Sequence, residues 1–180
     1  LGDLNLAKYI VLPHLISAAL IGMLFKKSSM SGGFAWDKNK KYISFYDAFN
    51  SSIYKSITSI LSIGGVIVIF SVFSNFFDSL LLSTSKYLSL SMSLSDMIHS
   101  LSVGILEISN GCSLAASSSL PLNVKLILIN FIISFSGVSV LFQTIAVSDD
   151  YNFNISSYIF HKSIQALLAA LICIIMLILY

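Results

Sequence analysis

The sequence contains no arginine and few charged residues of any kind. Its ten basic residues are all lysines, and charged residues make up only 10% of the 180 positions. Without guanidinium groups, the chain lacks the side chain that binds phosphate and carboxylate groups in bidentate fashion. The net charge of +2 is also too small to indicate binding to a nucleic acid. We therefore expect no nucleic-acid partner.

Cysteine and recognisable catalytic motifs are equally scarce. The two cysteines, Cys112 and Cys173, stand far apart, and neither has a histidine or a second cysteine at the spacing of a zinc site. We expect both to be structural thiols, with no metal and no cofactor. The sequence has no Gly-x-Ser-x-Gly elbow, no Gly-x-x-x-x-Gly-Lys phosphate loop and no His-Glu-x-x-His helix. Nothing in it indicates an enzyme.

Hydrophobic residues, in contrast, are abundant. They make up 56% of the chain, and the mean hydropathy is +0.90, whereas a soluble domain carries about 25% charged residues. Four apolar segments are long enough to cross a bilayer as helices, which takes ~20 residues each: about 4–25, 52–77, 122–147 and 156–180. We predict an all-α, polytopic integral membrane protein with about four transmembrane helices plus a re-entrant or broken helix.

The polar segments suggest how these helices are arranged. Five lysines lie between residues 26 and 41, which places this loop in the cytoplasm by the positive-inside rule. Residues 44–49 predict a short amphipathic helix, so that 26–51 form a cytoplasmic loop and an interfacial helix. Residues 79–96 are expected at the interface or outside. We interpret 1–180 as one membrane domain, and its start at Leu1 and end inside an apolar run predict a fragment of a longer protein.

The only glutamate, Glu107, lies in the apolar stretch 102–111. A carboxylate at membrane depth costs ~2.5–3.5 kcal/mol to insert, so it is a functional hypothesis by default. We expect a helix with Ser95 or Asp96 as N-cap that ends near Glu107, too short to cross alone. Residues 97–120 then form either a re-entrant hairpin or a broken helix that crosses. The structural alternative for Glu107 is an interhelical hydrogen bond or a lysine partner.

Small and polar residues complete the candidate binding site. Asn110 and Gly111 are expected at the hairpin tip, with backbone groups that face a solute or an ion, although Asn-Gly also forms ordinary turns. In the third span, a further cluster is expected to unwind the helix and bind the solute: Ser136, Gly137, Ser139 and Gln143. The alternative for these small residues is ordinary packing between membrane helices.

Two of these segments resemble sequence boxes of a known family. Gly104-Ile105-Leu106-Glu107-Ile108-Ser109-Asn110-Gly111 is similar to a Gly-Leu-(Phe/Leu)-Glu-(Ile/Met)-Thr-x-Gly box. Phe135-Ser136-Gly137-Val138-Ser139-Val140, with Gln143 after it, is similar to a Phe-(Ser/Gly)-Gly-(Phe/Leu)-Ser-Val-x-x-Gln box. On these motifs the chain resembles the YlbJ family of sporulation integral membrane proteins of Firmicutes. That family belongs with the nucleoside-recognition Gate-domain proteins.

The resemblance implies a C-terminal half of the family's length, with a polar site where two broken helices meet. The expected function is a transporter-like membrane protein of endospore formation that moves a small polar, nucleoside-like solute or an ion by alternating access. The alternative is a non-transporting structural or assembly protein of the spore envelope. The expected partners are the lipid bilayer, the N-terminal half of the same protein and a solute or coupling cation, with a homo-oligomer left open. The expected location is the cell membrane, in the forespore or the mother cell.

Overall fold

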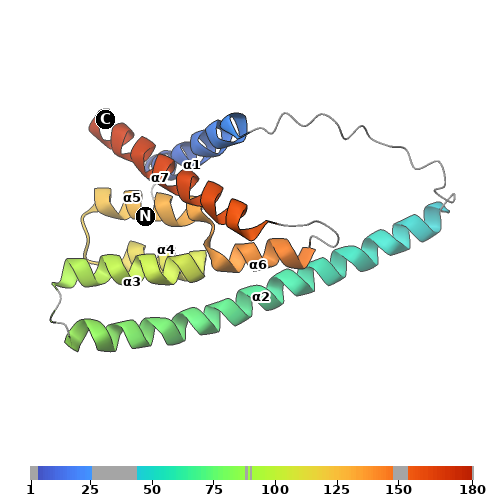
Figure 1. The fold of residues 1–180 in the computed structure, drawn as a ribbon, viewed down its shortest axis with the longest axis horizontal. Coiled ribbons are helices and arrows are strands. Elements are labelled where there is room, and N and C mark those ends of the chain that lie inside the picture. The colour runs from blue at the N-terminus through green and yellow to red at the C-terminus, as the bar shows by residue number, and fades with distance from the viewer. Residues whose placement is uncertain (1–3, 26–43, 88, 90, 148–153, 180) are drawn as a thin grey trace.

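The computed structural model describes residues 4–25, 44–87, 89, 91–147 and 154–179, and every secondary-structure element among them is a helix (Figure 1). The helices are α1 (Leu4–Leu24), α2 (Phe45–Tyr87), α3 (Met92–Leu106), α4 (Ile108–Ser117), α5 (Leu122–Phe135), α6 (Gly137–Val147) and α7 (Ile155–Leu179). Four stretches are long and apolar enough to cross a membrane, within α1, α2, α5 with α6, and α7. The predicted all-α, polytopic membrane fold is confirmed. The lysine-rich loop lies outside the described residues.

The outer surfaces of these helices are strongly apolar. Large hydrophobic side chains such as Ile60, Leu61 and Phe73 are more than half exposed on α2. One cluster of buried hydrophobic residues lies between α4, α5 and the turn that joins them, and it is made of Ala115, Leu120, Leu128, Ile129 and Ile132. Exposed apolar surface of this extent suits hydrocarbon rather than water. The chain is therefore a membrane protein in which the exposed large hydrophobic side chains outnumber the buried ones among the described residues.

Helix α2 is longer than the sequence predicted. It runs without a break over 43 residues, so the prediction of a separate approach helix at 44–49 was wrong. That prediction relied on polar residues near its start, but these are exposed on the helix surface and interrupt nothing. Residues 79–87, expected outside the span, continue the same helix. Figure 1 shows the N-terminal half of α2 extending away from the other helices.

A proline in α1 is compensated by a side chain from α5. Pro13 lies inside α1 and has no N–H, so it cannot donate to the carbonyl of Tyr9 four residues before it. The Nδ2 group of Asn130 donates to that carbonyl at 2.7 Å. Next to it, His14 Nδ1 lies 3.0 Å from Ser134 Oγ, also on α5. These polar contacts join α1 to α5 inside an otherwise apolar interface, and α7 packs against both helices.

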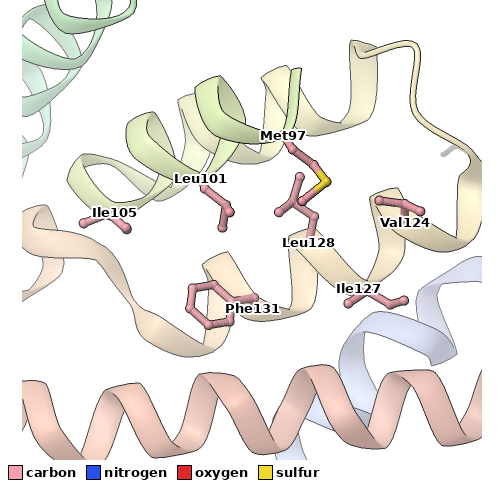
Figure 2. A pocket seen from close by; sticks show the side chains of 7 residues that line it. All are labelled: Met97, Leu101, Ile105, Val124, Ile127, Leu128 and Phe131. Carbon is pink, nitrogen blue, oxygen red and sulfur yellow. The ribbon is translucent and has the colours of Figure 1, made fainter. Parts of the chain in front are cut away.

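An apolar pocket lies between α3 and α5 (Figure 2). Its volume is ≈ 310 Å³, and its walls are apolar side chains, including Met97, Leu101 and Phe131. Binding sites for polar ligands need a few converging polar groups in addition to apolar walls. Because this pocket has none, we do not consider it as a site for a polar solute.

Candidate functional site: a helical hairpin and a bent helix

Helices α3 and α4 form an antiparallel hairpin with Glu107 at its tip. Glu107 is the only residue between them, and its extended backbone (φ −144°, ψ 122°) reverses the chain. Asp96 and Ser119 pair at the open end of the hairpin, where the Oδ2 atom of Asp96 accepts from the N–H and the hydroxyl of Ser119, both at 2.8 Å. Of the two arrangements left open for residues 97–120, the structure has the hairpin.

Two local predictions for this hairpin were wrong. The N-cap of α3 is Ser91, not Ser95 or Asp96. Asp96 instead closes the open end of the hairpin through Ser119, which holds its pKa below the usual value. The tip is Glu107 and not Asn110–Gly111, which lie in the first turn of α4. The Asn-Gly pair suggested a turn, but the carboxylate just before it caps a helix instead.

The Glu107 carboxylate is bound within its own hairpin. Its Oε1 accepts the N–H of Ser109 at 3.1 Å, and its Oε2 accepts the N–H of Asn110 at 2.7 Å. Free N–H groups and the positive end of the helix dipole make a helix N-terminus favourable for a carboxylate. Only 4% of Glu107 is exposed. The two cap bonds therefore explain how an acidic group is held in an apolar region, with no ion pair to a lysine among the described residues.

Glycines bring the two arms of the hairpin into backbone contact. A Cβ atom built on Gly111 would lie 2.2 Å from the Cα of Gly104 and 2.5 Å from its nitrogen. Real side chains do not come this close, so no other residue fits at position 111 in this arrangement. Gly111 thus sets the spacing between the two helices of the hairpin and does not form its tip, where the sequence analysis had placed it.

The second interruption lies between α5 and α6. Ser136 adopts the left-handed region (φ 70°, ψ 7°) and Gly137 follows at φ 57°, so the helix predicted to unwind here does so at these two residues. A Cβ atom on Gly137 would lie 3.3 Å from the carbonyl oxygen of Gly104 and 3.4 Å from Ile108. The bend of α5–α6 therefore rests against the tip of the hairpin, on both sides of Glu107.

The other two predicted residues of the third span lie farther along α6. The Nε2 group of Gln143 donates to the hydroxyl of Ser139 at 3.0 Å. Ser139 is buried, and Gln143 is half-buried. Within the described part of the chain, the structure shows no hydrogen bond from either residue to the hairpin. The sequence analysis grouped these four residues in one cluster, but the structure places Ser136 and Gly137 against the hairpin tip and bonds Ser139 to Gln143.

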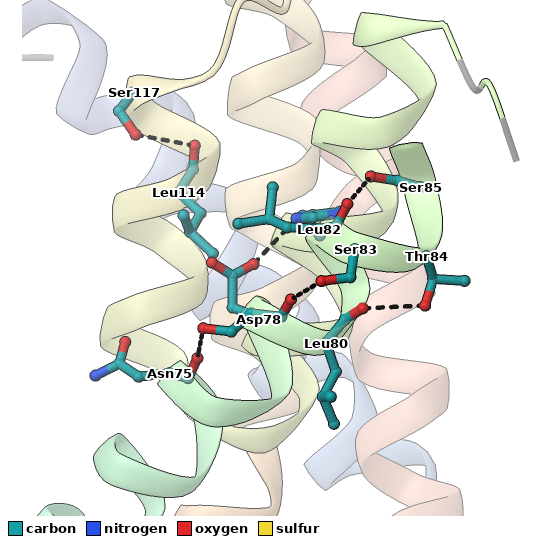
Figure 3. A network of polar contacts seen from close by, with 11 residues as sticks. Asn75, Asp78, Leu80, Leu82, Ser83, Thr84, Ser85, Leu114 and Ser117 are labelled. Carbon is teal, nitrogen blue, oxygen red and sulfur yellow. Dashed lines mark hydrogen bonds and ion pairs between the residues drawn. The ribbon is translucent and has the colours of Figure 1, made fainter. Parts of the chain in front are cut away.

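Sequence reasoning missed a polar cluster on α2. The Nδ2 group of Asn110 donates to Ser74 Oγ at 2.7 Å. One turn farther along α2, Asp78 Oδ1 lies 3.0 Å from Nδ1 of His99 on α3. Figure 3 shows Asn75 and Asp78 on α2 beside Leu114 of the hairpin. The available signal was the helical spacing of these polar residues at 74, 75 and 78.

Histidine, cysteine and acidic residues do not gather into a metal centre. Among the described residues, no group of three or more of these side chains is placed to hold a metal ion. Cys112 and Cys173 are both free thiols on different helices. A tightly bound transition metal is therefore not supported by the side chains that the structure places.

Comparison with known proteins adds no relative. None of the family models, curated proteins or solved structures compared with the chain matches it.

Proposed function

We propose that the chain is a transporter-like integral membrane protein that moves a small polar solute or an ion by alternating access. One observation carries the proposal: two interrupted helical segments meet at a buried carboxylate, with the α3–α4 tip at Glu107 against the bend at Gly137. Interrupted helices with polar groups at their ends are the usual construction of solute and ion sites in secondary transporters. The resemblance to the YlbJ family adds endospore formation as the setting and a nucleoside-like solute as the class.

Each residue has a role in this proposal. Glu107 binds a cation, a proton or a solute hydroxyl through the lone pairs that its two cap bonds leave free. Ser136 and Gly137 form the left-handed bend that lies against the tip. The N–H of Ser136 stays bonded to the carbonyl of Ile132, so in this proposal the pair shapes the site rather than donating that group to the solute. Ser139 and Gln143 bond each other and would join the site only after α6 shifts. The N-terminal half expected from the resemblance would supply the opposite wall.

A second candidate is a non-transporting structural protein of the spore membrane. It is favoured by the fact that both oxygens of Glu107 already accept hydrogen bonds from Ser109 and Asn110. In this reading the carboxylate is an N-cap that shapes the hairpin, and its charge has no ligand. The two candidates therefore differ in whether the negative charge, or only the cap, is needed.

Two variants at one position separate these candidates. Glu107→Asp keeps both the negative charge and a good N-cap residue. Glu107→Asn also keeps a good N-cap residue, with a side chain as long as that of Asp, but removes the charge. Wild type and both variants would be reconstituted into liposomes and assayed for uptake of nucleosides, nucleobases and divalent cations, with and without pH and sodium gradients. Thermal unfolding in detergent would establish that both variants fold.

Saturable, gradient-dependent uptake that Glu107→Asp retains and Glu107→Asn loses would support transport with a charged site. Sporulation assays of cells that carry each variant give the matching readout in vivo. If wild type takes up no member of the panel and Glu107→Asn cells sporulate normally, the structural candidate replaces the transporter.

A further inference from the structure

A small polar pocket lies between α2 and the hairpin, apart from the Glu107 tip. Its volume is ≈ 130 Å³, and it is lined by Asn75, Asp78, Val103, Asn110, Ser113 and Leu114. Pockets for organic ligands usually measure ~300–1,000 Å³, so this one is too small for a nucleoside. It is several times larger than the ~10–15 Å³ that one water occupies. It has room for an ion with part of its water shell.

The polar groups of this pocket are mainly oxygen acceptors. Asp78 uses Oδ1 to contact His99, and no described residue bonds its other carboxylate oxygen. Asn110 points its amide nitrogen at Ser74, which leaves its carbonyl oxygen for the pocket. Asn75 and the hydroxyl of Ser113 add two more oxygens. Carboxylate, amide and hydroxyl oxygens are the donors that hard cations prefer.

The charge on Asp78 has no lysine partner among the described side chains. Lys125, on α5, donates instead to the carbonyl of Ala116. His99 is 6% exposed and contacts Asp78 through Nδ1. Among the described residues, its buried Nε2 has no hydrogen-bond partner. A carboxylate within a membrane protein's helices is normally paired or placed in a water-lined cavity. Asp78 therefore combines a fixed orientation with an open oxygen.

From this geometry we propose that the pocket binds a small monovalent cation. Asp78 is the charged ligand, and Asn75, Asn110 and Ser113 provide neutral oxygens. His99 is a positioning residue that orients the carboxylate, as partners of metal ligands commonly do. One carboxylate suits a single positive charge, whereas calcium sites of proteins collect several carboxylates. The proposal goes beyond the transport function and holds for a protein that binds the ion without moving a solute.

The pocket shares one residue with the hairpin tip. The backbone N–H of Asn110 caps Glu107, while its side chain lies in the pocket. A cation held by Asn110 would thus contact the residue that fixes the Glu107 carboxylate. Occupancy of the pocket is expected to stabilise the hairpin against unfolding, since ligands that bind only the folded state stabilise it by mass action.

The test measures binding alone. Purified protein in detergent would be titrated with ²²Na⁺ and, separately, unfolded by heat in NaCl, KCl, ammonium chloride or choline chloride at equal ionic strength. We expect saturable Na⁺ binding and a rise in unfolding temperature that choline does not produce. Asp78→Asn should raise the Kd at least tenfold, since it removes the only charged ligand. Asp96→Asn, at the far end of the hairpin, is the matched control and should bind as wild type does.

Further variants keep the test decisive if Asp78→Asn fails to fold. Asn75 is exposed on α2, so Asn75→Ala should fold normally and still raise the Kd several-fold. His99→Gln should weaken binding without abolishing saturation, because it disturbs only the orientation of Asp78.

Specific binding of K⁺ or ammonium with the same dependence on Asp78 supports the site and identifies its ion. Equal effects of all four salts, or unchanged binding in Asp78→Asn, would overturn the proposal. Lost uptake with retained Na⁺ binding would count against transport only.

Discussion

The contact between Asn130 and the carbonyl of Tyr9 provides the sharpest test of how this fold is held together. Pro13 leaves that carbonyl without its helical donor, and Asn130 is fully buried beside it at 2.7 Å. Asn130→Leu replaces the amide with an apolar side chain of similar size. The carbonyl of Tyr9 then loses this donor at a part-buried position between α1 and α5. We expect the protein to be destabilised and α1 to pack less firmly on α5.

The expected magnitude follows from two opposing effects. Leaving a buried carbonyl unsatisfied costs about 1–3 kcal/mol, while hydrogen bonds between membrane helices average ~0.6 and reach ~1.7 kcal/mol in double-mutant cycles. Asn130 also buries its own Oδ1, which has no hydrogen-bond partner among the described residues, and the leucine removes that cost. The single substitution therefore underestimates the contact. We expect a coupling energy of about 1–1.5 kcal/mol between positions 13 and 130, near the upper end of the membrane range.

A double-mutant cycle with Pro13→Ala isolates this energy. Alanine at position 13 has an N–H that can donate to the carbonyl of Tyr9 inside α1. In that background Asn130→Leu should cost little or even stabilise. The measurement is SDS-induced unfolding in mixed micelles, followed by circular dichroism, for the wild type, both single variants and the double variant. An equal loss of stability from Asn130→Leu in both backgrounds would refute the assigned role of Asn130.

Three further predictions concern the hairpin and the bend. Gly111→Ala should destabilise the protein by about 1–3 kcal/mol in thermal unfolding, because the new Cβ would lie 2.2 Å from the Cα of Gly104. Gly64→Ala is the control and should be neutral or stabilising, because a Cβ there would meet nothing within 4 Å. Gly137→Ala should cost about 1–2 kcal/mol by the same assay, since φ is +57° there, and an unchanged unfolding temperature would contradict the bend. Asp96 has a lowered pKa because Ser119 donates two hydrogen bonds to it. The stability that this carboxylate contributes is therefore full above its ordinary pKa and is lost as the pH falls through the lowered pKa. Asp96→Asn should remove this part of the acid sensitivity of unfolding, and a pH profile identical to that of the wild type would show that Asp96 contributes nothing to it.

Much of the fold was predictable because hydrocarbon solvation leaves few options. A run of ~20 apolar residues in a chain of this composition must satisfy its backbone internally, and a helix does so within one segment. The break near Ser136 was also predictable, since serines and a glycine replace the large apolar residues on both sides of it. These signals act locally, within one or two turns of a helix. Local signals of this kind can be read from one sequence.

The details of the site depended on contacts that no local pattern reveals. Glu107 was recognised as unusual, but its capping role follows from the reversal of the chain at that residue. The close approach of Gly111 to Gly104 is set by the packing of two antiparallel helices, so no periodic pattern in the sequence predicts it. Asp78 and His99 are 21 residues apart and come together only when α2 folds back against α3. Long-range polar pairs of this type need the three-dimensional arrangement.

The length of α2 has a mechanical consequence. A helix of 43 residues is about 64 Å long. Even at a tilt of ~40°, the upper end of the usual range, it rises about 49 Å, which exceeds the ~40–45 Å of a whole bilayer with its headgroups. An α2 that crosses the bilayer would therefore project beyond it at one end, and the polar N-terminal turns around Asp47 and Lys55 suit that end. Ser74 and Asp78 attach the C-terminal half of α2 to the hairpin. A force applied to the N-terminal end of α2 would therefore be transmitted to the hairpin.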